Sequence, residues 1–88
     1  MYKYKTKGTC SREISFDIKD GKLYNVKFLG GCPGNLQAIG KLVEGKDVET
    51  IMNLLEGNTC GPRPTSCADQ LSKALKEAYV DHTLEEVL

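Results

Sequence analysis

Four cysteines are the residues of this chain whose type best suits chemistry. They are Cys10, Cys32, Cys60 and Cys67, and each falls in a predicted connection or at the end of a predicted element. A cysteine that only packs belongs within an apolar stripe. A thiolate, by contrast, ligates a metal ion or attacks an electrophile. We therefore expect the four cysteines to converge on one site, with metal binding as the leading interpretation.

The spacing of the cysteines is a weak zinc signal by itself. Twenty-one residues separate Cys10 from Cys32, 27 separate Cys32 from Cys60 and six separate Cys60 from Cys67, so the sequence has no CxxC knuckle. Four thiolates nonetheless form the usual closed zinc site, and thiolates also suit iron–sulfur clusters. If the four cysteines are metal ligands, we expect zinc in the first place and an iron–sulfur cluster in the second.

Two of the cysteines are expected at the N-termini of helices. Pro33 suits the first position of a helix, which places Cys32 at the N-cap, and Cys67 follows the capping residue Ser66. The unpaired N–H groups and the positive dipole end of a helix stabilise a thiolate relative to a thiol. Metal ligation and thiol reactivity both profit from this setting.

Two other interpretations of the cysteines stay open. In a thiol redox protein, Cys60 and Cys67, or Cys10 and Cys32, cycle between dithiol and disulfide. In a plain interaction domain the cysteines merely pack. Acid–base catalysis has little support, because the only histidine, His82, lies far from every cysteine in sequence and is expected at the surface.

Size and charge exclude several functional classes. The 88 residues predict one domain, 1–88, with a core too small for an enclosed active site. Twelve basic and twelve acidic residues give no electrostatic footprint for nucleic acid. The sequence contains no apolar run that predicts a signal peptide or a membrane span. We expect a cytoplasmic protein, and a reducing compartment favours metal or redox chemistry over structural disulfides.

The apolar pattern predicts strands first and helices afterwards. Alternating residues predict strands over 2–7, 12–18 and 23–29. Three helical stripes follow, the third beginning near a capping box of Ser66 and Asp69. The stripes are Leu36, Ile39, Leu42 and Val43; Val48, Ile51, Leu54 and Leu55; and Leu71, Ala74, Leu75, Ala78 and Tyr79. This order predicts an α+β fold, a three-stranded antiparallel sheet with three helices on one face.

The sequence also predicts the state of the C-terminal residues and of the second face of the sheet. Residues 84–88 are expected to form a short helix or to fray. The sheet face away from the helices is expected to be wet, because polar side chains alternate with the apolar ones. These polar residues are Glu13, Ser15, Asp17, Asn25 and Lys27.

The hairpin between the second and third strands has two candidate registers. A two-residue loop at 20–21 pairs Phe16 with Asn25, which places a polar group opposite a core group. A three-residue loop at 19–21 pairs Phe16 with Tyr24 and keeps both faces consistent. We therefore expect the three-residue loop.

This register decides where Cys10 lies. It pairs Ile14 with Val26 and, continued outward, sets Cys10 opposite Gly30. Cys10 and Cys32 are then expected at the same end of the sheet.

Several motifs of the chain resemble the TSCPD-domain family. The resemblance runs from Gly8 into the third helix, and proline stands in the name-giving motif where this chain has Ala68. Both residues are tolerated in the first turn of a helix. The matching stretches are Gly30-Gly31-Cys32-Pro33-Gly34-Asn35-Leu36, Leu42-Val43-Glu44-Gly45, Thr59-Cys60-Gly61 and Thr65-Ser66-Cys67-Ala68-Asp69-Gln70-Leu71.

The resemblance implies an accessory role. Similar domains occur as small stand-alone proteins and as C-terminal parts of ribonucleotide reductases, and their cysteines are suggested to hold metal. The chain cannot contain a reductase barrel, so we expect a metal-binding domain related to ribonucleotide reductases, not an enzyme on its own. The expected partner is a ribonucleotide reductase or another protein. The alternative is a thiol redox protein, or a component of ribonucleoside-diphosphate reductase activity, that uses a cysteine pair.

A fainter likeness connects the chain with iron–sulfur cluster scaffold proteins. Those proteins also run from a three-stranded sheet into Gly-Cys, a helix and a Val-x-Gly-Lys turn, matched here by residues 43–46. Their cysteine after the third strand, a cluster ligand, corresponds to Cys32. The likeness concerns organisation only.

Overall fold

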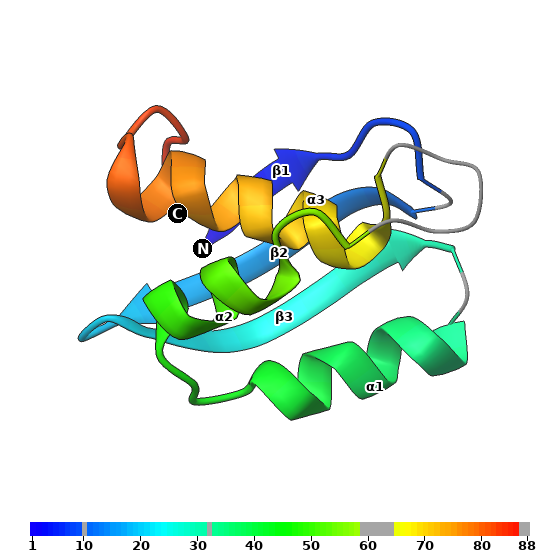
Figure 1. The fold of residues 1–88 in the computed structure, drawn as a ribbon, viewed down its shortest axis with the longest axis horizontal. Helices are drawn as coiled ribbons and strands as arrows, with labels where there is room; N and C mark the ends of the chain where they lie inside the picture. Colours follow the sequence, from blue (N-terminus) through cyan, green and yellow to red (C-terminus); the bar gives the residue numbers. More distant parts are fainter. Residues whose placement is uncertain (10, 32, 59–64, 87–88) are drawn as a thin grey trace.

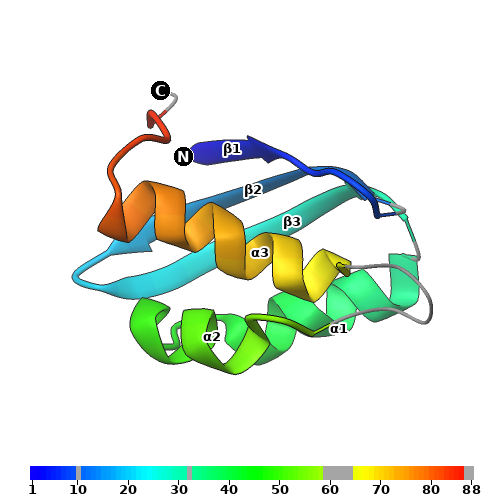
Figure 2. The same ribbon diagram turned by 45° about the horizontal axis from the view of Figure 1, so that its top comes forward.

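Three antiparallel strands precede three helices in the computed structural model of the chain, which describes residues 1–9, 11–31, 33–58 and 65–86. All three helices lie on one face of the sheet (Figure 1 and Figure 2), so the predicted α+β fold is confirmed. The strands, in spatial order, are β1 (Tyr2–Lys5), β2 (Ser11–Lys19) and β3 (Lys22–Gly30). The helices are α1 (Pro33–Val43), α2 (Val48–Leu55) and α3 (Cys67–Leu75), and a π-helical segment, η1 (Lys76–Val80), follows α3.

The core lies between the sheet and the helices. Ile14 and Phe16 of β2 are fully buried there, as are Leu71 and Leu75 of α3. Helix α1 packs against β3, α3 packs against β2, and α2 packs against α3. On the other face of the sheet, the polar residues expected to be wet are half-buried or exposed. Alternation along β2 thus separates a core face from a polar face, as predicted.

The hairpin between β2 and β3 has a two-residue turn, so the predicted three-residue loop was wrong. Lys19 pairs with Lys22, and the turn residues Asp20 and Gly21 have positive φ angles of 53° and 74°. Two successive positive φ angles are typical of a type I′ turn, whose twist matches that of the flanking strands.

A bulge at Asn25 removes the conflict that favoured the longer loop. The register shifts between Ser15 and Asp17, so Ile14 pairs with Phe28 instead of the predicted Val26. Asn25 has a φ of 56°, its N–H donates to Glu44 Oε1 (2.8 Å), and its side-chain amide donates to Asp17 Oδ2 (2.9 Å). An extra residue in one strand reverses which side chains face inward beyond it.

The bulge also changes which residues of β3 belong to the core. Leu23 is fully buried before the bulge and Val26 is buried after it, whereas Tyr24 is only half-buried. Regular alternation along this strand, with Asn25 and Lys27 on the wet face, would place Tyr24, Val26 and Phe28 on the core face. The prediction fails at Tyr24 because the inserted residue puts both Leu23 and Val26 on the inner side.

At the far end of the hairpin, Ser11 pairs with Gly30. A second register shift, between Ser11 and Glu13, precedes this pair. The predicted position of Cys10 opposite Gly30 lies outside the described residues. Its neighbour Ser11 nevertheless occupies that place in the ladder.

The predicted helices all form, but two leucines of their stripes do not reach the core. Leu42 is 72% exposed and Leu54 is 70% exposed. Helix α1 instead buries Leu36 and Val43, which lie seven residues apart and therefore on one side of the helix. Leu42 precedes Val43 by one residue and points about 100° away from it, because an α-helix has 3.6 residues per turn.

The end of the described chain runs beside β1. Glu86 forms an antiparallel bridge with Tyr2, and Leu84 packs against the core, so no helix forms over residues 84–86. Tyr79, predicted on the buried side of the third helix, is 39% exposed. Residues 87–88 lie outside the described residues.

Candidate functional site

Cys67 opens helix α3 at the end of the sheet where Ser11 pairs with Gly30. Ser66 caps this helix, since its Oγ accepts a hydrogen bond from the Asp69 N–H (3.1 Å). The Cys67 sulfur is buried and lies 3.1 Å from Ser11 Oγ. The N-terminal placement predicted for Cys67 is therefore confirmed. The other predicted ligands, Cys10, Cys32 and Cys60, lie outside the described residues.

Ser11 joins the start of β2 to Cys67. It is 3% exposed, and its carbonyl accepts hydrogen bonds from Thr6 Oγ1 (2.5 Å) and Thr9 Oγ1 (3.2 Å). Thr6 N–H also donates to the Arg12 carbonyl (3.2 Å). These bonds fold the segment before Ser11 back on the strand. As a result, the stretch of chain that leads to Cys10 is held near the first turn of α3.

Asp69 is the centre of a buried polar network in the first turn of α3. It is 3% exposed, and its carboxylate accepts from the Gly57 N–H (2.7 Å) and from the Thr65 hydroxyl. Lys73 Nζ lies 3.0 Å from the same carboxylate. Burial alone would raise the pKa of Asp69, but the hydrogen bonds from Thr65 and Gly57 and the ammonium of Lys73 outweigh it and lower the pKa.

The predicted capping box is half confirmed. Ser66 caps the helix, but the Asp69 carboxylate bonds to Gly57 and Thr65. Asp69 therefore ties the end of the segment after α2 to the segment before α3. In addition, Ser66 Oγ donates to the carbonyl of Asn58.

Gln70 extends the same network to the N-terminal segment. Its side-chain oxygen accepts from the Lys7 N–H (3.0 Å), and its amide nitrogen donates to Thr65 Oγ1 (3.0 Å). Both Gln70 and Thr65 are buried. The amphipathic pattern predicts only apolar residues on the buried side of α3, so it does not indicate this network. The signal that could have revealed this network was the dense polar run from Thr65 to Gln70, in a first turn where free N–H groups need acceptors.

Three separate segments meet at the start of α3. Ser11 lies next to Cys10 in sequence, Gly31 next to Cys32, and Asn58 two residues before Cys60. Ser11 pairs with Gly30 and contacts Cys67, while Asn58 is bonded to Ser66. Within residues 1–9, 11–31, 33–58 and 65–86, no group of three or more His, Cys, Asp or Glu side chains is placed to hold a metal ion.

His82 lies in an exposed turn after η1, with a φ of 54°. The expectation that it is a surface residue is confirmed. His82 belongs to the segment after η1, which runs beside β1. This segment follows the C-terminal end of α3, whereas Cys67 lies at the N-terminal end of that helix (Figure 1).

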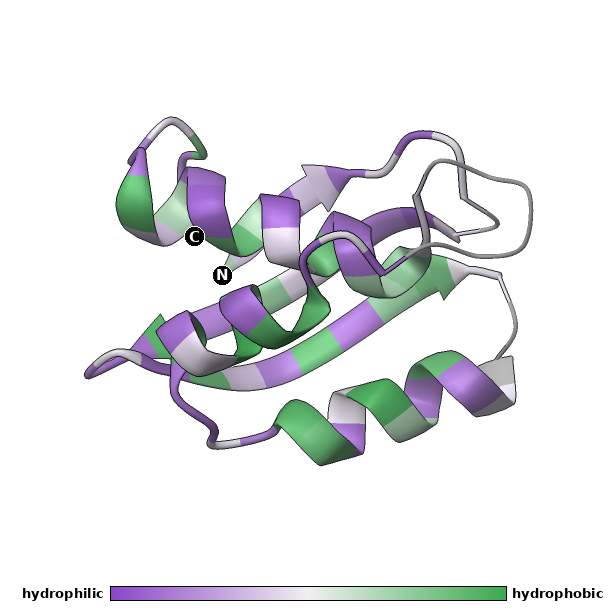
Figure 3. Cartoon of the chain, viewed as in Figure 1, coloured by the Kyte–Doolittle hydropathy of each residue, from purple (hydrophilic) through white to green (hydrophobic). Residues whose placement is uncertain are grey.

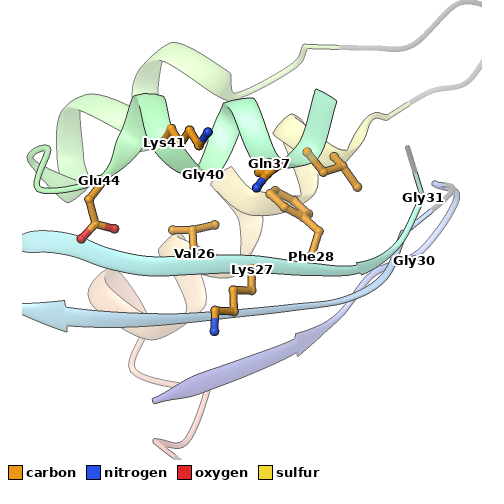
Figure 4. Close-up of a pocket in the computed structure, with 10 residues that line it drawn as sticks. Val26, Lys27, Phe28, Gly30, Gly31, Gln37, Gly40, Lys41 and Glu44 are labelled. Carbon is orange, nitrogen blue, oxygen red and sulfur yellow. The ribbon is translucent and has the colours of Figure 1, made fainter. Parts of the chain in front are cut away.

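An open groove of about 710 Å³ runs between β3 and α1 and reaches Gly30 and Gly31. Figure 4 shows Val26 and Phe28 pointing from β3 toward α1, whereas Lys27 points to the opposite face of the sheet. Helix α1 carries Gly40 on the side that faces β3, where an added Cβ would lie 2.9 Å from the Val26 carbonyl oxygen. Close packing of α1 on β3 thus fixes the helix whose first turn follows Cys32.

The fold and this polar network define a small α+β domain with a buried cysteine at a helix N-terminus. The family model described as TSCPD domain matches residues 2–79, and the chain belongs to this family. No curated protein and no solved structure matches the chain. In the described part of the chain, none of the helices combines the length and the apolar character that a membrane crossing needs.

Proposed function

We propose that this TSCPD domain is an accessory metal-binding module in which the thiolates of Cys10, Cys32, Cys60 and Cys67 hold one metal ion, zinc in the first place. The observation that carries the proposal is the setting of Cys67. Its buried sulfur lies 3.1 Å from Ser11 Oγ, at the point where the segments leading to the other three cysteines are tied together.

Chain geometry supports a shared site. An extended chain covers at most about 3.6 Å per residue, so one or two residues span roughly 7 Å or less. Each of Cys10, Cys32 and Cys60 is within two residues of a described residue that pairs with or bonds to this end of the fold. The four sulfur atoms therefore need only short reaches to meet.

The donor set and its surroundings suit a metal held by thiolates. Four thiolates give a closed zinc site with Zn–S distances of about 2.3 Å. The N-terminus of α3 supplies N–H groups and a positive dipole end beside Cys67, and the Ser11 hydroxyl is within reach to donate to its sulfur. A bound ion would add its free energy of binding to folding. An iron–sulfur cluster fits the same donors.

The accessory role rests on the family resemblance. TSCPD-like domains occur within ribonucleotide reductases, so we expect this module to serve a reductase or another protein in the cytoplasm. Its small core leaves no place for an enclosed reductase active site, which argues against complete reductase activity from this chain alone.

Metal analysis of protein purified without chelator tests the proposal. We expect about one zinc ion per chain, and we expect each single Cys→Ser variant to lose most of it, because a missing ligand opens the site. His82→Ala is the matched control and should keep its metal. Metal-free protein with a titratable disulfide would favour the redox alternative instead. Four Cys→Ala variants that stay folded and tolerate chelator would favour a plain interaction domain.

A further inference from the structure

An apolar groove of about 500 Å³ lies between α1 and α2. Met1 and Glu86, the two ends of the described chain, lie beside β1. Strand β1 lies across the molecule from α1 and α2 (Figure 1 and Figure 2). Ile39 and Val43 of α1 and Ile51 and Leu55 of α2 line the groove. Figure 3 shows hydrophobic stretches on both helices. The described residues that line this groove take no part in the polar network around Cys67.

Two leucines project from the rim of this groove. Leu42 and Leu54 are 72% and 70% exposed, which makes them the most exposed large apolar side chains of the described chain. A single exposed leucine is ordinary on a protein surface. Two exposed leucines that flank one apolar groove form a contiguous patch with it, and such patches mark interaction sites.

We propose that the groove is the interface of a two-fold symmetric dimer of this chain. A two-fold contact uses the same patch on both copies, so one patch must contain both the side chains that project and the groove that receives them. Here Leu42 and Leu54 project beside the groove that would receive them. One copy inserts these leucines into the groove of the other, and the second copy does the same in return.

The charges at the groove favour a second copy over a partner of one sign. Lys46 and Asp47 lie side by side in the link between the helices and line the groove. The Asp47 carboxylate is fixed by the N–H and the hydroxyl of Thr50, at 3.0 Å and 3.1 Å. A peptide of one charge sign is attracted by one of the two charges and repelled by the other, so it gains little, whereas a two-fold related copy can set Lys46 against Asp47 and Asp47 against Lys46. The zero net charge of the chain leaves the copies without mutual repulsion.

Sedimentation equilibrium over about 1–500 µM protein, under reducing conditions, tests the dimer. We expect the mass to rise with concentration from the 9.7 kDa of one chain to twice that value. Leu42→Lys and Leu54→Lys should each raise the dimer dissociation constant by at least about 100-fold, because they place a charge in the apolar centre of the interface. Leu29→Lys is the control, since Leu29 is 54% exposed and lies outside the groove.

Charge reversal gives a second, independent set of variants. Lys46→Glu should weaken the dimer about 10-fold by facing Asp47 of the other copy with a like charge. Lys41→Glu, the same reversal on α1 outside this groove, should leave the dissociation constant unchanged. Circular dichroism confirms that each variant folds, which the exposure of Leu42 and Leu54 leads us to expect.

Two results overturn the inference. One is a wild-type chain that stays monomeric at the highest concentration, which would leave the groove to a different partner such as an amphipathic helix. The other is a dimer that Leu42→Lys and Leu54→Lys leave intact, which would place the interface elsewhere. Among the described residues, those that line the groove and those of the polar network at the start of α3 are different, so either result is independent of the metal proposal.

Discussion

Substitution of Asp69 by alanine tests whether the polar network at the start of α3 stabilises the fold. The change removes the acceptor of the Gly57 N–H and of the Thr65 hydroxyl. Each polar group left unsatisfied in a buried setting costs roughly 1–3 kcal/mol. Thr65 is buried and its hydroxyl loses its acceptor, whereas Gly57 is exposed and its N–H can bond to water, so we place the total loss at about 2 kcal/mol.

This loss is large for a chain of 88 residues, whose free energy of unfolding is expected at roughly 4–13 kcal/mol. Urea denaturation followed by circular dichroism measures it. Lys73→Ala is the matched control. The Lys73 side chain is 53% exposed, so solvent screens its ion pair with Asp69 and the loss should stay below about 1 kcal/mol. A loss of less than about 1 kcal/mol for Asp69→Ala would refute the role of the network.

The pH dependence gives the same prediction an independent check. The pKa of Asp69 is lower in the folded chain than its ordinary value of 3.8, so the folded state favours the carboxylate. The stabilisation is fully present above that ordinary value and is lost as the pH falls through the folded pKa. Asp69→Asn should therefore flatten the fall of stability in acid. An unchanged acid slope in Asp69→Asn would contradict the assignment.

Two backbone predictions concern β3 and its contact with α1. Gly40→Ala should destabilise the fold by about 1–3 kcal/mol in thermal or urea unfolding, because the new Cβ meets the Val26 carbonyl oxygen at 2.9 Å. Gly34→Ala, on the same helix with open space around it, should be neutral or stabilise by up to about 1 kcal/mol, and equal losses at both positions would contradict the close contact. Asn25→Ala should lose roughly 1–2 kcal/mol, since alanine resists a φ of 56°, while Asn25→Gly should lose less; the reverse order would contradict the bulge.

The fold class followed from the sequence because alternation and helical periodicity are local signals. The register did not follow. Its prediction treated Asn25 as a regular strand residue, and only the tolerance of asparagine for positive φ pointed to a bulge. Leu42 and Leu54 were assigned to the core by hydrophobicity, although each helix has room to bury only one side.

The candidate site was predictable in part. The helix start at Pro33 and the place of Cys67 in the first turn of α3 followed from capping preferences, and both are confirmed. The contact between Ser11 and Cys67 joins residues 56 positions apart, and it depends on two register shifts in the hairpin. Such a long-range contact carries no local signal. The convergence of all four cysteines stays a prediction.

The most direct test of the central proposal is the metal content of the chain, purified without chelator and compared with its four single Cys→Ser variants. Cobalt(II) substitution adds a spectroscopic count of thiolate ligands. The proposal predicts about one zinc ion per chain, lost when Cys10, Cys32, Cys60 or Cys67 is replaced and kept in His82→Ala. Metal-free wild-type protein, or a variant such as Cys10→Ser with unchanged metal content and stability, would contradict the four-cysteine site.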